Sequence, residues 1–524
     1  GAHHLMARFL EIVLDVPVSA MPVAGRHRTR PTGFAKALGA ALPELGAASV
    51  SDLRIDTVTF DHGSQFADAG WRVGVESHGD ARQVTVSRRA MLTPGMTAHT
   101  TTFIASLDAA GIANALFDSA PAPFRHALAA AGDLRPAATL VCERSRWPWS
   151  RDGVDAELVV DANVRETADE APVLHELRVR VPWPDDADAA PLVDALFARA
   201  FEIVDVVPAF VRLEETALRA ARGGIEGGST VAYAASIELG RVQSAQAALV
   251  AICHNVTAQW FGNDAGVRTS ARTESVHQMR VSQRRLRTAL RIFSRWADED
   301  WKARIAPELK WLRGLLGELR DLDVFVDGTL PALAAADSDA ARWEVALERA
   351  RAERDETRKR VREALASPRY ARAALAWLQW VALLARREAH DEGDDRSLLR
   401  HAKKRVSRYY RHLASTPKLT AVDDARRHRA RIDAKYLRYT LEFFEPIVSR
   451  GTRTKTARTL SRIQSVLGDG NDAAVALSYL EAMNVDPYQL GFARGWCEAV
   501  KRYTAKEGER LLRELGKPKV PGDA

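Results

Sequence analysis

Hydrophobic and polar positions follow different periods in the two halves of the chain. In the first part, apolar side chains alternate with polar ones over short runs bounded by Gly or Asp, which is typical of β-strands. The clearest runs are Phe9–Val16, Leu53–Phe60, Trp71–Val75, Gln83–Val86, Ala156–Val160 and Leu174–Val181. Helical periods occur at Gly33–Leu42, Pro121–Ala131 and Ala190–Ala200. The pattern predicts an α+β domain over residues 7–220, with its sheet closed into a barrel.

A glycine-rich segment marks the change of period. Residues 221–230 read ARGGIEGGST, with four glycines and no apolar period, and we interpret them as a linker. Beyond them the apolar positions recur with a helical period, which predicts an all-α domain over 231–515 and a tail over 516–524. We expect helices at 231–261, 273–296, 302–325, 338–366, 370–390, 395–414, 422–445, 455–467, 471–483 and 487–515. Gly468–Gly470 is expected to form a turn between two of them.

An internal repeat at an offset of 151 residues is the strongest signal in the helical part. HQMRVSQRRLRTALRIF begins at His277, and HRARIDAKYLRYTLEFF begins at His428. A second pair of segments, Leu316-Gly317 with Asp321 and Leu467-Gly468 with Asp472, has the same offset. Two matches at one offset without a gap indicate a duplicated helical unit, so we expect two pseudo-symmetric helical bundles.

The repeated segments place cations along one side of a helix. The first column consists of His277, Arg280, Arg284 and Arg287, and the second of His428, Arg431, Lys435 and Arg438. At about 100° per residue each column spans roughly 80°, while Leu286, Leu290, Phe293 and their equivalents lie on the opposite side. Like charges at these spacings repel one another, and a polyanion would relieve the repulsion. We therefore expect the two columns to face each other across one groove or pore, with Arg291 extending the first.

Two further features allow a functional or a structural interpretation. A third column, His401, Arg405, Arg408 and His412, repeats at helical spacing within SLLRHAKKRVSRYYRHL, but a solvated helix face would look the same. Asp321 and Asp323 could be taken for a metal-binding pair. We prefer carboxylates that orient neighbouring arginines, because a metal site needs more carboxylates and no adjacent cation column. We expect no metal and no cofactor.

The charge balance supports an anionic partner for the helical part. From Val231 onward there are 53 Lys and Arg against 38 Asp and Glu, whereas the preceding residues have 22 against 30. Such asymmetry points to a polyanion bound by the basic half. The three cysteines are far apart and odd in number, which favours a reducing cytoplasm. No apolar run reaches the length of a membrane span.

The repeated His-x2-Arg-x3-Arg/Lys-x2-Arg pattern, followed by WLRGLLGELRDLDV, resembles the CHAD domain, the conserved-histidine α-helical domain. The resemblance extends over about 290 residues of this sequence. It implies helical bundles around a basic cavity that binds inorganic polyphosphate, with both columns as binding residues. Lys435 stands where the first copy has an arginine, and Glu442 is the equivalent of Arg291.

The N-terminal region resembles a degraded CYTH domain, the triphosphate tunnel fold. The family opens with a strand E-x-E-x-K, but here Glu11 is followed by Val13 and Asp15. Trp71-Arg72 and His175-Glu176 resemble later strands of that family, each with one of the expected charges. Triphosphate hydrolysis needs several carboxylates for divalent metal and several cations for phosphate, so the resemblance implies a domain without catalysis and with a scaffolding or partner-binding role.

Three functions are compatible with the sequence. The one we favour is non-catalytic binding of inorganic polyphosphate by a cytoplasmic protein, associated with polyphosphate granules. The second is a metal-dependent triphosphatase or polyphosphatase at the N-terminal domain, against which Val13 and Asp15 speak. The third is nucleic-acid binding. It is disfavoured because single-strand binders interleave aromatic side chains with the cations, and the columns carry none except Tyr439 at an edge.

Overall fold

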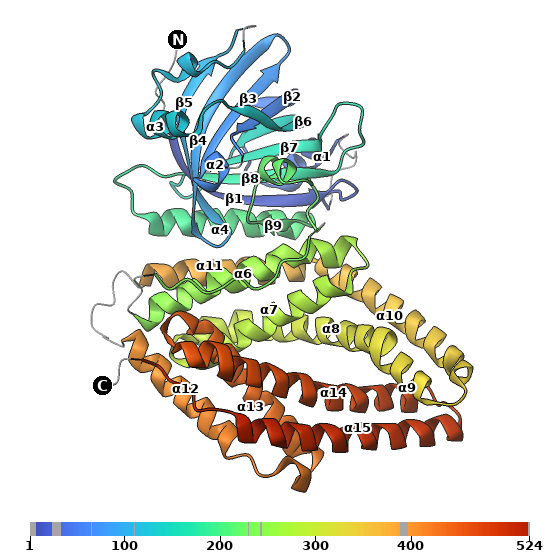
Figure 1. Cartoon of the computed structure of the whole chain (residues 1–524). Helices are drawn as coiled ribbons and strands as arrows, with labels where there is room; N and C mark the ends of the chain where they lie inside the picture. Colours follow the sequence, from blue (N-terminus) through green and yellow to red (C-terminus); the bar gives the residue numbers. More distant parts are fainter. Residues whose placement is uncertain are drawn as a thin grey trace. The chain divides into compact units, whose positions relative to one another are not determined.

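The computed structural model describes residues 7–23, 33–63, 65–108, 111–228, 230–240, 244–387 and 397–521 (Figure 1). Contacts divide the chain into two units. The first consists of the residues up to Thr230 together with Ala364–Leu383, and the second of Val231–Glu363 and the residues from Leu384 onward. The predicted order, an α+β barrel followed by an all-α region, is confirmed.

Eight antiparallel strands close into a barrel in the first unit. Around the ring the order is β1, β5, β4, β3, β2, β6, β7, β8 and back to β1. The strands are β1 (Ala7–Pro17), β2 (Val50–Asp61), β3 (Trp71–His78), β4 (Ala81–Thr93), β5 (Met96–Ser106), β6 (Arg135–Pro148), β7 (Glu157–Arg165) and β8 (Leu174–Pro182). A ninth strand, β9 (Phe210–Arg212), pairs with Val13–Asp15 of β1, beyond the segment that pairs with β5.

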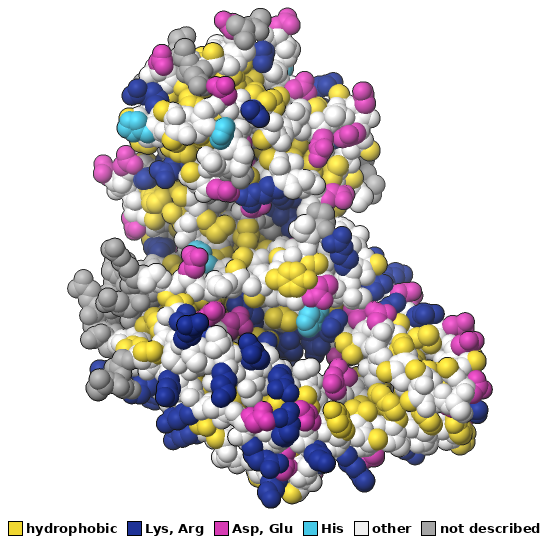
Figure 2. Space-filling view, in the orientation of Figure 1, with side chains coloured by type: hydrophobic (Ala, Val, Ile, Leu, Met, Phe, Trp, Pro, Cys, Tyr) yellow, Lys and Arg dark blue, Asp and Glu magenta, His cyan; other side chains and the backbone are white. Residues whose placement is uncertain are grey.

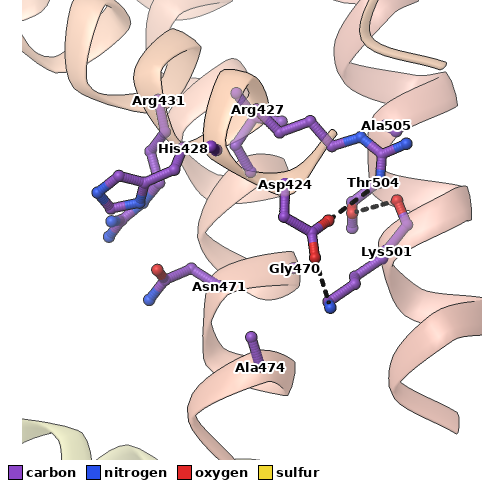
Figure 3. A pocket seen from close by; sticks show the side chains of 12 residues that line it. Asp424, Arg427, His428, Arg431, Gly470, Asn471, Ala474, Lys501, Thr504 and Ala505 are labelled. Carbon is purple, nitrogen blue, oxygen red and sulfur yellow. Dashed lines mark hydrogen bonds and ion pairs between the residues drawn. The ribbon is translucent and has the colours of Figure 1, made fainter. Parts of the chain in front are cut away.

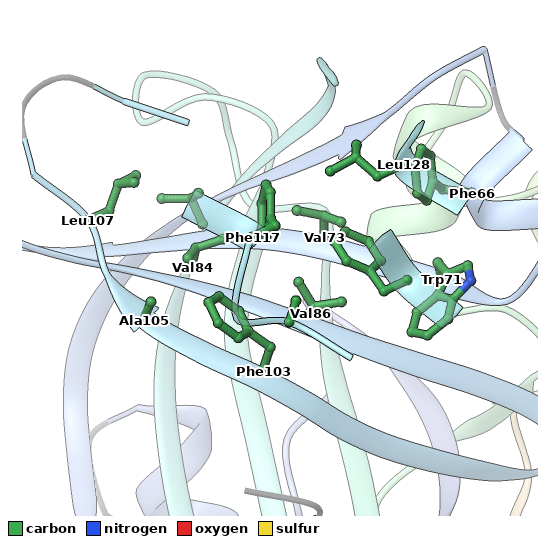
Figure 4. Packing of buried hydrophobic residues seen from close by; sticks show 13 residues of the cluster. Phe66, Trp71, Val73, Val84, Val86, Phe103, Ala105, Leu107, Phe117 and Leu128 are labelled. Carbon is green, nitrogen blue, oxygen red and sulfur yellow. The ribbon is translucent and has the colours of Figure 1, made fainter. Parts of the chain in front are cut away.

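Alternation along the strands separates an apolar core from a charged interior. The apolar positions of β3 are Trp71, Val73 and Val75, each at most 7% exposed. They join a buried cluster to which α2 (Gln65–Asp68) and α3 (Ala122–Ala131) contribute Phe66 and Leu128 (Figure 4). Arg72 and Glu76, which alternate with them, pair instead with Glu215 and Arg144 inside the barrel. The strand period therefore places charges in the interior.

Three further helices and one helix distant in sequence complete the first unit. The three are α1 (Phe34–Ala41), α4 (Ala189–Val206) and α5 (Thr216–Ala221). The distant one is α11 (Pro368–Arg387), most of which belongs to this unit. Its Tyr370 ring lies 6.5 Å from that of Phe210, and Arg372 pairs with Asp205 at 2.6 Å. The helical domain expected over 231–515 thus includes a helix that packs with the barrel.

The segment interpreted as a linker is partly structural. Ile225 is 4% exposed and packs with Ile55, Leu140 and Leu174 in a core cluster of the barrel unit. A single isoleucine among four glycines has no period, so the sequence pattern could not show that it is buried.

The second unit consists of helices arranged as two copies of one plan. The first copy holds α6 (Ala245–Thr269), α7 (Thr273–Ile292), α8 (Ala306–Val324), α9 (Leu330–Ala336) and α10 (Glu344–Leu365). The second holds α12 (Leu398–Ala414), α13 (Asp424–Phe443), α14 (Ala457–Ala482) and α15 (Pro487–Glu514). Between α7 and α8, and again between α13 and α14, the chain makes a 3-10 turn and a π-helical turn.

The structure repeats at the offset found in the sequence. α13 begins and ends 151 residues after α7, and the 3-10 turns Ser294–Trp296 and Glu445–Ile447 have the same offset. So do the π-helical turns Trp301–Ile305 and Thr452–Thr456. The predicted duplication is therefore confirmed. The predicted core face is confirmed as well, because Leu286 and its equivalent Leu437 are at most 1% exposed.

Two predictions about helices were wrong. Gly468–Gly470 is not a turn, since α14 continues through it. A Cβ on Gly470 would lie 2.8 Å from Thr504 Oγ1, so the glycine allows α15 to pack closely without ending the helix. The helix expected from residue 231 begins only at Ala245. The backbone of Ala232 is instead held by the Asn263 side chain, which accepts from its N–H at 3.1 Å and donates to its carbonyl at 2.7 Å.

Cys142, Cys253 and Cys497 are buried free thiols, as expected from their spacing. Among the described residues, no helix combines the length and the apolar character needed to cross a membrane.

Candidate functional site

The structure brings the first and second columns together. Lys435 on α13 has Arg280, Arg284 and Arg287 of α7 as electrostatic neighbours. Among the charges around Arg431, the charge of Arg284 has the strongest effect on its pKa. The backbone explains this placement, because each helix buries its leucine face and turns the column on its other face toward the facing helix. We define the cation cluster as His277, Arg280, Arg284, Arg287, His428, Arg431 and Lys435.

Burial and mutual repulsion make the cation cluster electrostatically costly. Burial and four neighbouring arginines lower the pKa of Lys435 to about 8. Burial, followed by the charge of Arg320, lowers the pKa of His277 to about 4. The pKa of Arg431 is lowered by burial and by Arg284. Each shift disfavours the charged form of a group in the cation cluster, so a bound anion would be strongly favoured there.

Carboxylates compensate little of this charge. Arg280 pairs with Asp321 at 3.2 Å, as expected for a carboxylate that orients an arginine. Across the part of the chain that the structure describes, no ion pair joins Arg284, Arg287, Arg431 or Lys435 to a carboxylate. Asp472, the equivalent of Asp321, interacts with Arg431 only at longer range, and burial raises its pKa.

The ends of the two columns lie against tyrosine rings. The Arg291 guanidinium is 4.6 Å from the centre of the Tyr436 ring, and that of Arg438 is 5.1 Å from the centre of Tyr439. Both tyrosines are at most 6% exposed. Arg291 also belongs to the charged surroundings of Asp433. These two arginines are therefore held by aromatic contacts at the borders of the cation cluster.

The third column is not part of the cation cluster. His401 stacks on Phe293 with ring centres 4.8 Å apart, and its ring is 6.4 Å from that of Phe444. Both phenylalanines are fully buried core residues, so His401 lies on the core side of α7 and α13. The charged neighbours of Arg405 are Tyr409 and Arg408 of its own helix. Helical spacing alone could not show that α12 turns this histidine toward aromatic side chains.

Arg408 is exposed on the outer surface of α12. Figure 2 shows Lys and Arg side chains gathered over the region of α12 and α13 on the face drawn. This surface adds positive charge to the second unit without contributing to the cation cluster.

Two arginines of α8 that lie beside the cation cluster were missed in the sequence. Burial and the charge of Arg287 lower the pKa of Arg313 to about 10, and Arg320 is the largest charged neighbour of His277. They stand seven residues apart, hence on one helix face. That spacing is visible in WLRGLLGELRDLDV, where it could have indicated a third wall of cations.

The barrel interior is charged as well, but its charges are matched. Arg144 lies between Asp161 at 2.7 Å and Glu76 at 2.5 Å, and Arg178 contacts Asp161 at 2.7 Å. Glu11 accepts from Arg180, and it pairs with Arg89 at 2.6 Å. All of these residues except Glu11 line a cavity of about 140 Å³. Every arginine lining that cavity has a carboxylate partner, whereas in the cation cluster Arg280 is the one arginine paired with a carboxylate of the described residues.

The remaining acidic residues of the barrel do not fit a metal site. Glu176 accepts from the backbone and hydroxyl of Thr216 at 2.8 and 2.5 Å, and Asp15 pairs with Arg212 and Arg219. Glu11 is held by arginines. In the described residues, no three His, Cys, Asp or Glu side chains are grouped so that they could hold a metal ion.

The family model of the CHAD domain matches residues 251–481, and this match confirms the resemblance stated from the sequence for this part of the chain. Comparison with curated proteins gives no match.

Several solved structures are similar to parts of the chain. The CHAD domain from the plant Ricinus communis is 27% identical, with a TM-score of 0.48 and coverage of 56% of this chain and 99% of that one. PptA from Streptomyces chartreusis is 21% identical, with a TM-score of 0.34 and coverage of 47% and 89%. A Hippeastrum protein described as having a dominant triphosphatase activity is 13% identical, with a TM-score of 0.28 and coverage of 41% and 96%.

Proposed function

We propose that the second unit binds inorganic polyphosphate through the cation cluster and does no chemistry on it. The observation that carries this proposal is a set of facing arginines and a lysine, half-buried apart from the exposed Arg287. Among the described residues, only Arg280 of this set pairs with a carboxylate. Arginine makes bidentate, charge-assisted hydrogen bonds to phosphate oxygens. A chain of phosphates can contact both columns at once and relieve their repulsion.

The contrast between the two units supports this location. In the barrel each lining arginine is neutralised by Asp or Glu, so an entering phosphate would have to displace an existing ion pair. In the cation cluster, as far as the structure describes the chain, a phosphate meets cations of which only Arg280 has such a partner. We propose that the barrel has a scaffolding role or binds a protein partner.

Nucleic acid fits this site less well. Binding single strands without sequence preference relies on aromatic faces on which the bases stack. Tyr436 and Tyr439 are buried beneath Arg291 and Arg438, so their faces are covered. Polyphosphate has no bases to stack.

The proposal is tested by titrating the full chain with polyphosphate of defined length, with single-stranded DNA and RNA as competitors. The affinity should fall with salt, with a log–log slope of about −0.7 per phosphate engaged by analogy with single strands. A weaker affinity for polyphosphate than for either nucleic acid at equal charge would overturn the proposal.

Polyphosphate affinity should fall by roughly tenfold between pH 7 and pH 9. The pKa of Lys435 is about 8 in the free protein, below its ordinary value of 10.5, because the amine is buried and because arginines surround it. A bound polyanion favours the protonated amine, so binding takes up a proton once the pH exceeds about 8. Calorimetry in buffers of different ionisation enthalpy measures both the affinity and the proton uptake.

Lys435→Arg is the matched control, since arginine keeps its charge throughout this range. The variant should bind polyphosphate with nearly constant affinity from pH 7 to pH 9. The lowered pKa of Lys435 also affects the stability of the free protein. Between about pH 8 and 10.5 the unfolded chain binds more protons than the folded chain, so this residue makes the free energy of unfolding rise with pH. If the polyphosphate affinity of Lys435→Arg depended on pH as strongly as that of the unmodified protein, a group other than Lys435 would be responsible.

We expect no phosphate release from ATP, tripolyphosphate or long polyphosphate with Mg²⁺ or Mn²⁺. The reason is that Glu11 and Glu176 are committed to Arg180 and Thr216. Phosphate release by the purified chain is measured over hours with a colorimetric assay. Turnover that disappears in Glu11→Ala or Glu176→Ala would establish the triphosphatase alternative.

A further inference from the structure

A cavity of about 370 Å³ opens beside the cation cluster, between α13, α14 and α15 (Figure 3). His428 and Arg431 of the cation cluster form one side of it. Lys501 of α15 donates to Asp424 at 2.8 Å on the other side. Arg427, which also lines the cavity, pairs with Asp424 as well, so among the described residues the cations without a carboxylate partner lie at one side of the cavity.

The remaining walls of this cavity are mostly apolar. Leu467, Ala474 and Ala505 supply aliphatic surface, and Asn471 and Thr504 supply the polar groups. The Thr504 hydroxyl donates to the carbonyl of Val500 at 2.8 Å, so its oxygen remains an acceptor. An amide can both donate and accept. Such a wall suits a flat organic group with a few polar edges better than it suits a phosphate chain, because burying phosphate against aliphatic carbon costs hydration.

In the first copy of the repeat, side chains fill the place that is equivalent to this cavity. At the offset of 151, Gly470 corresponds to Leu319, Asn471 to Arg320 and Ala474 to Asp323. Leu319 and Asp323 are at most 1% exposed, and Arg358 of α10 approaches Asp323 to 3.7 Å. The small residues of the second copy thus leave a cavity at the place that larger side chains fill in the first copy. Binding of a polyphosphate chain by two equivalent columns does not require this difference.

We propose that the cavity takes the base and sugar of a nucleoside polyphosphate, whose phosphates lie on His428, Arg431 and the rest of the cation cluster. This inference rests on the proposed function, since it uses the same cations for the phosphates. Its volume falls within the range of small-molecule pockets, and its single cationic side sets the direction in which such a ligand enters. Asn471 and Thr504 are placed to contact the polar edge of the base.

The test compares ATP with inorganic tripolyphosphate on the full chain. Both should bind, and saturation-transfer NMR should show adenine and ribose protons receiving magnetisation from protein methyl groups. Ala474→Leu fills the cavity and should weaken ATP binding by roughly tenfold while changing tripolyphosphate affinity by less than about twofold. Asn471→Leu is a second variant with the same expectation, should the first fail to fold.

Ser465→Leu is the matched control, because it adds a leucine to an exposed position of α14 that does not line the cavity. It should leave both affinities unchanged. If tripolyphosphate binds but the adenine protons receive no saturation, or if both ligands respond alike to Ala474→Leu, the nucleoside site is overturned while the proposed function stands. If neither ligand nor longer polyphosphate binds, the proposed function fails first.

Discussion

Arg284→Ala should weaken polyphosphate binding more than any other single truncation in the cation cluster. Arg284 is an electrostatic neighbour of His277, Arg280, Arg431 and Lys435, so it lies at the centre of the cluster. A charge-assisted hydrogen bond contributes about 1.5–3 kcal/mol, which corresponds to a loss of roughly 10- to 100-fold in affinity. Isothermal calorimetry at fixed salt measures this loss.

Arg284→Ala should not lower the free energy of unfolding. No carboxylate of the described residues pairs with Arg284, so its removal relieves repulsion and should raise the pKa of Lys435. Arg429→Ala is the matched control, because it removes one cation from an exposed position of α13 next to His428. The control should weaken binding only slightly. An equal loss in both variants would mean that net charge, and not the facing columns, determines affinity.

Leu286→Ala and Leu437→Ala should each destabilise the second unit by about 2–5 kcal/mol. Both leucines are at most 1% exposed and hold equivalent positions on α7 and α13, so each substitution leaves a cavity in the core. The cations lie on the opposite faces of these helices, and the folded fraction should still bind polyphosphate. Loss of helical signal in denaturant measures the free energy of unfolding.

Val345→Ala provides the comparison. Val345 is 68% exposed on α10, and shortening it should change the free energy of unfolding by no more than about 0.5 kcal/mol. If Leu286→Ala is severe and Leu437→Ala is mild, the two copies do not share one packing plan despite their identical helix bounds. Loss of binding in the folded fraction would show that the core faces also set the geometry of the columns.

The repeat could be predicted because two independent signals share one offset. Core leucines and column cations recur together, and α7 and α13 start and end at equivalent residues. The prediction that the two columns face each other followed from this symmetry. Two related helices that each bury their apolar side can turn their cationic sides toward the same groove. Helical periodicity is a local property of the chain and is visible without knowledge of tertiary contacts.

What could not be predicted depends on contacts between distant segments. The continuity of α14 through Gly468–Gly470 is explained by α15, which packs against Gly470. The position of His401 depends on Phe293, more than a hundred residues earlier. The matched charges of the barrel, such as Arg72 with Glu215, join strands to a helix far along the chain. Single-sequence patterns carry no information on such pairings.

The membership of α11 in the first unit has a consequence for synthesis on the ribosome. The barrel strands are complete at Arg212, but α11 begins only at Pro368, after the whole first copy of the helical repeat. At ~5–20 residues per second this interval lasts roughly 8–30 s. During that time Phe210, which is 3% exposed in the finished structure, lacks the Tyr370 ring that packs beside it. The nascent barrel must therefore avoid aggregation while this surface is uncovered and the first copy of the helical repeat is being synthesised.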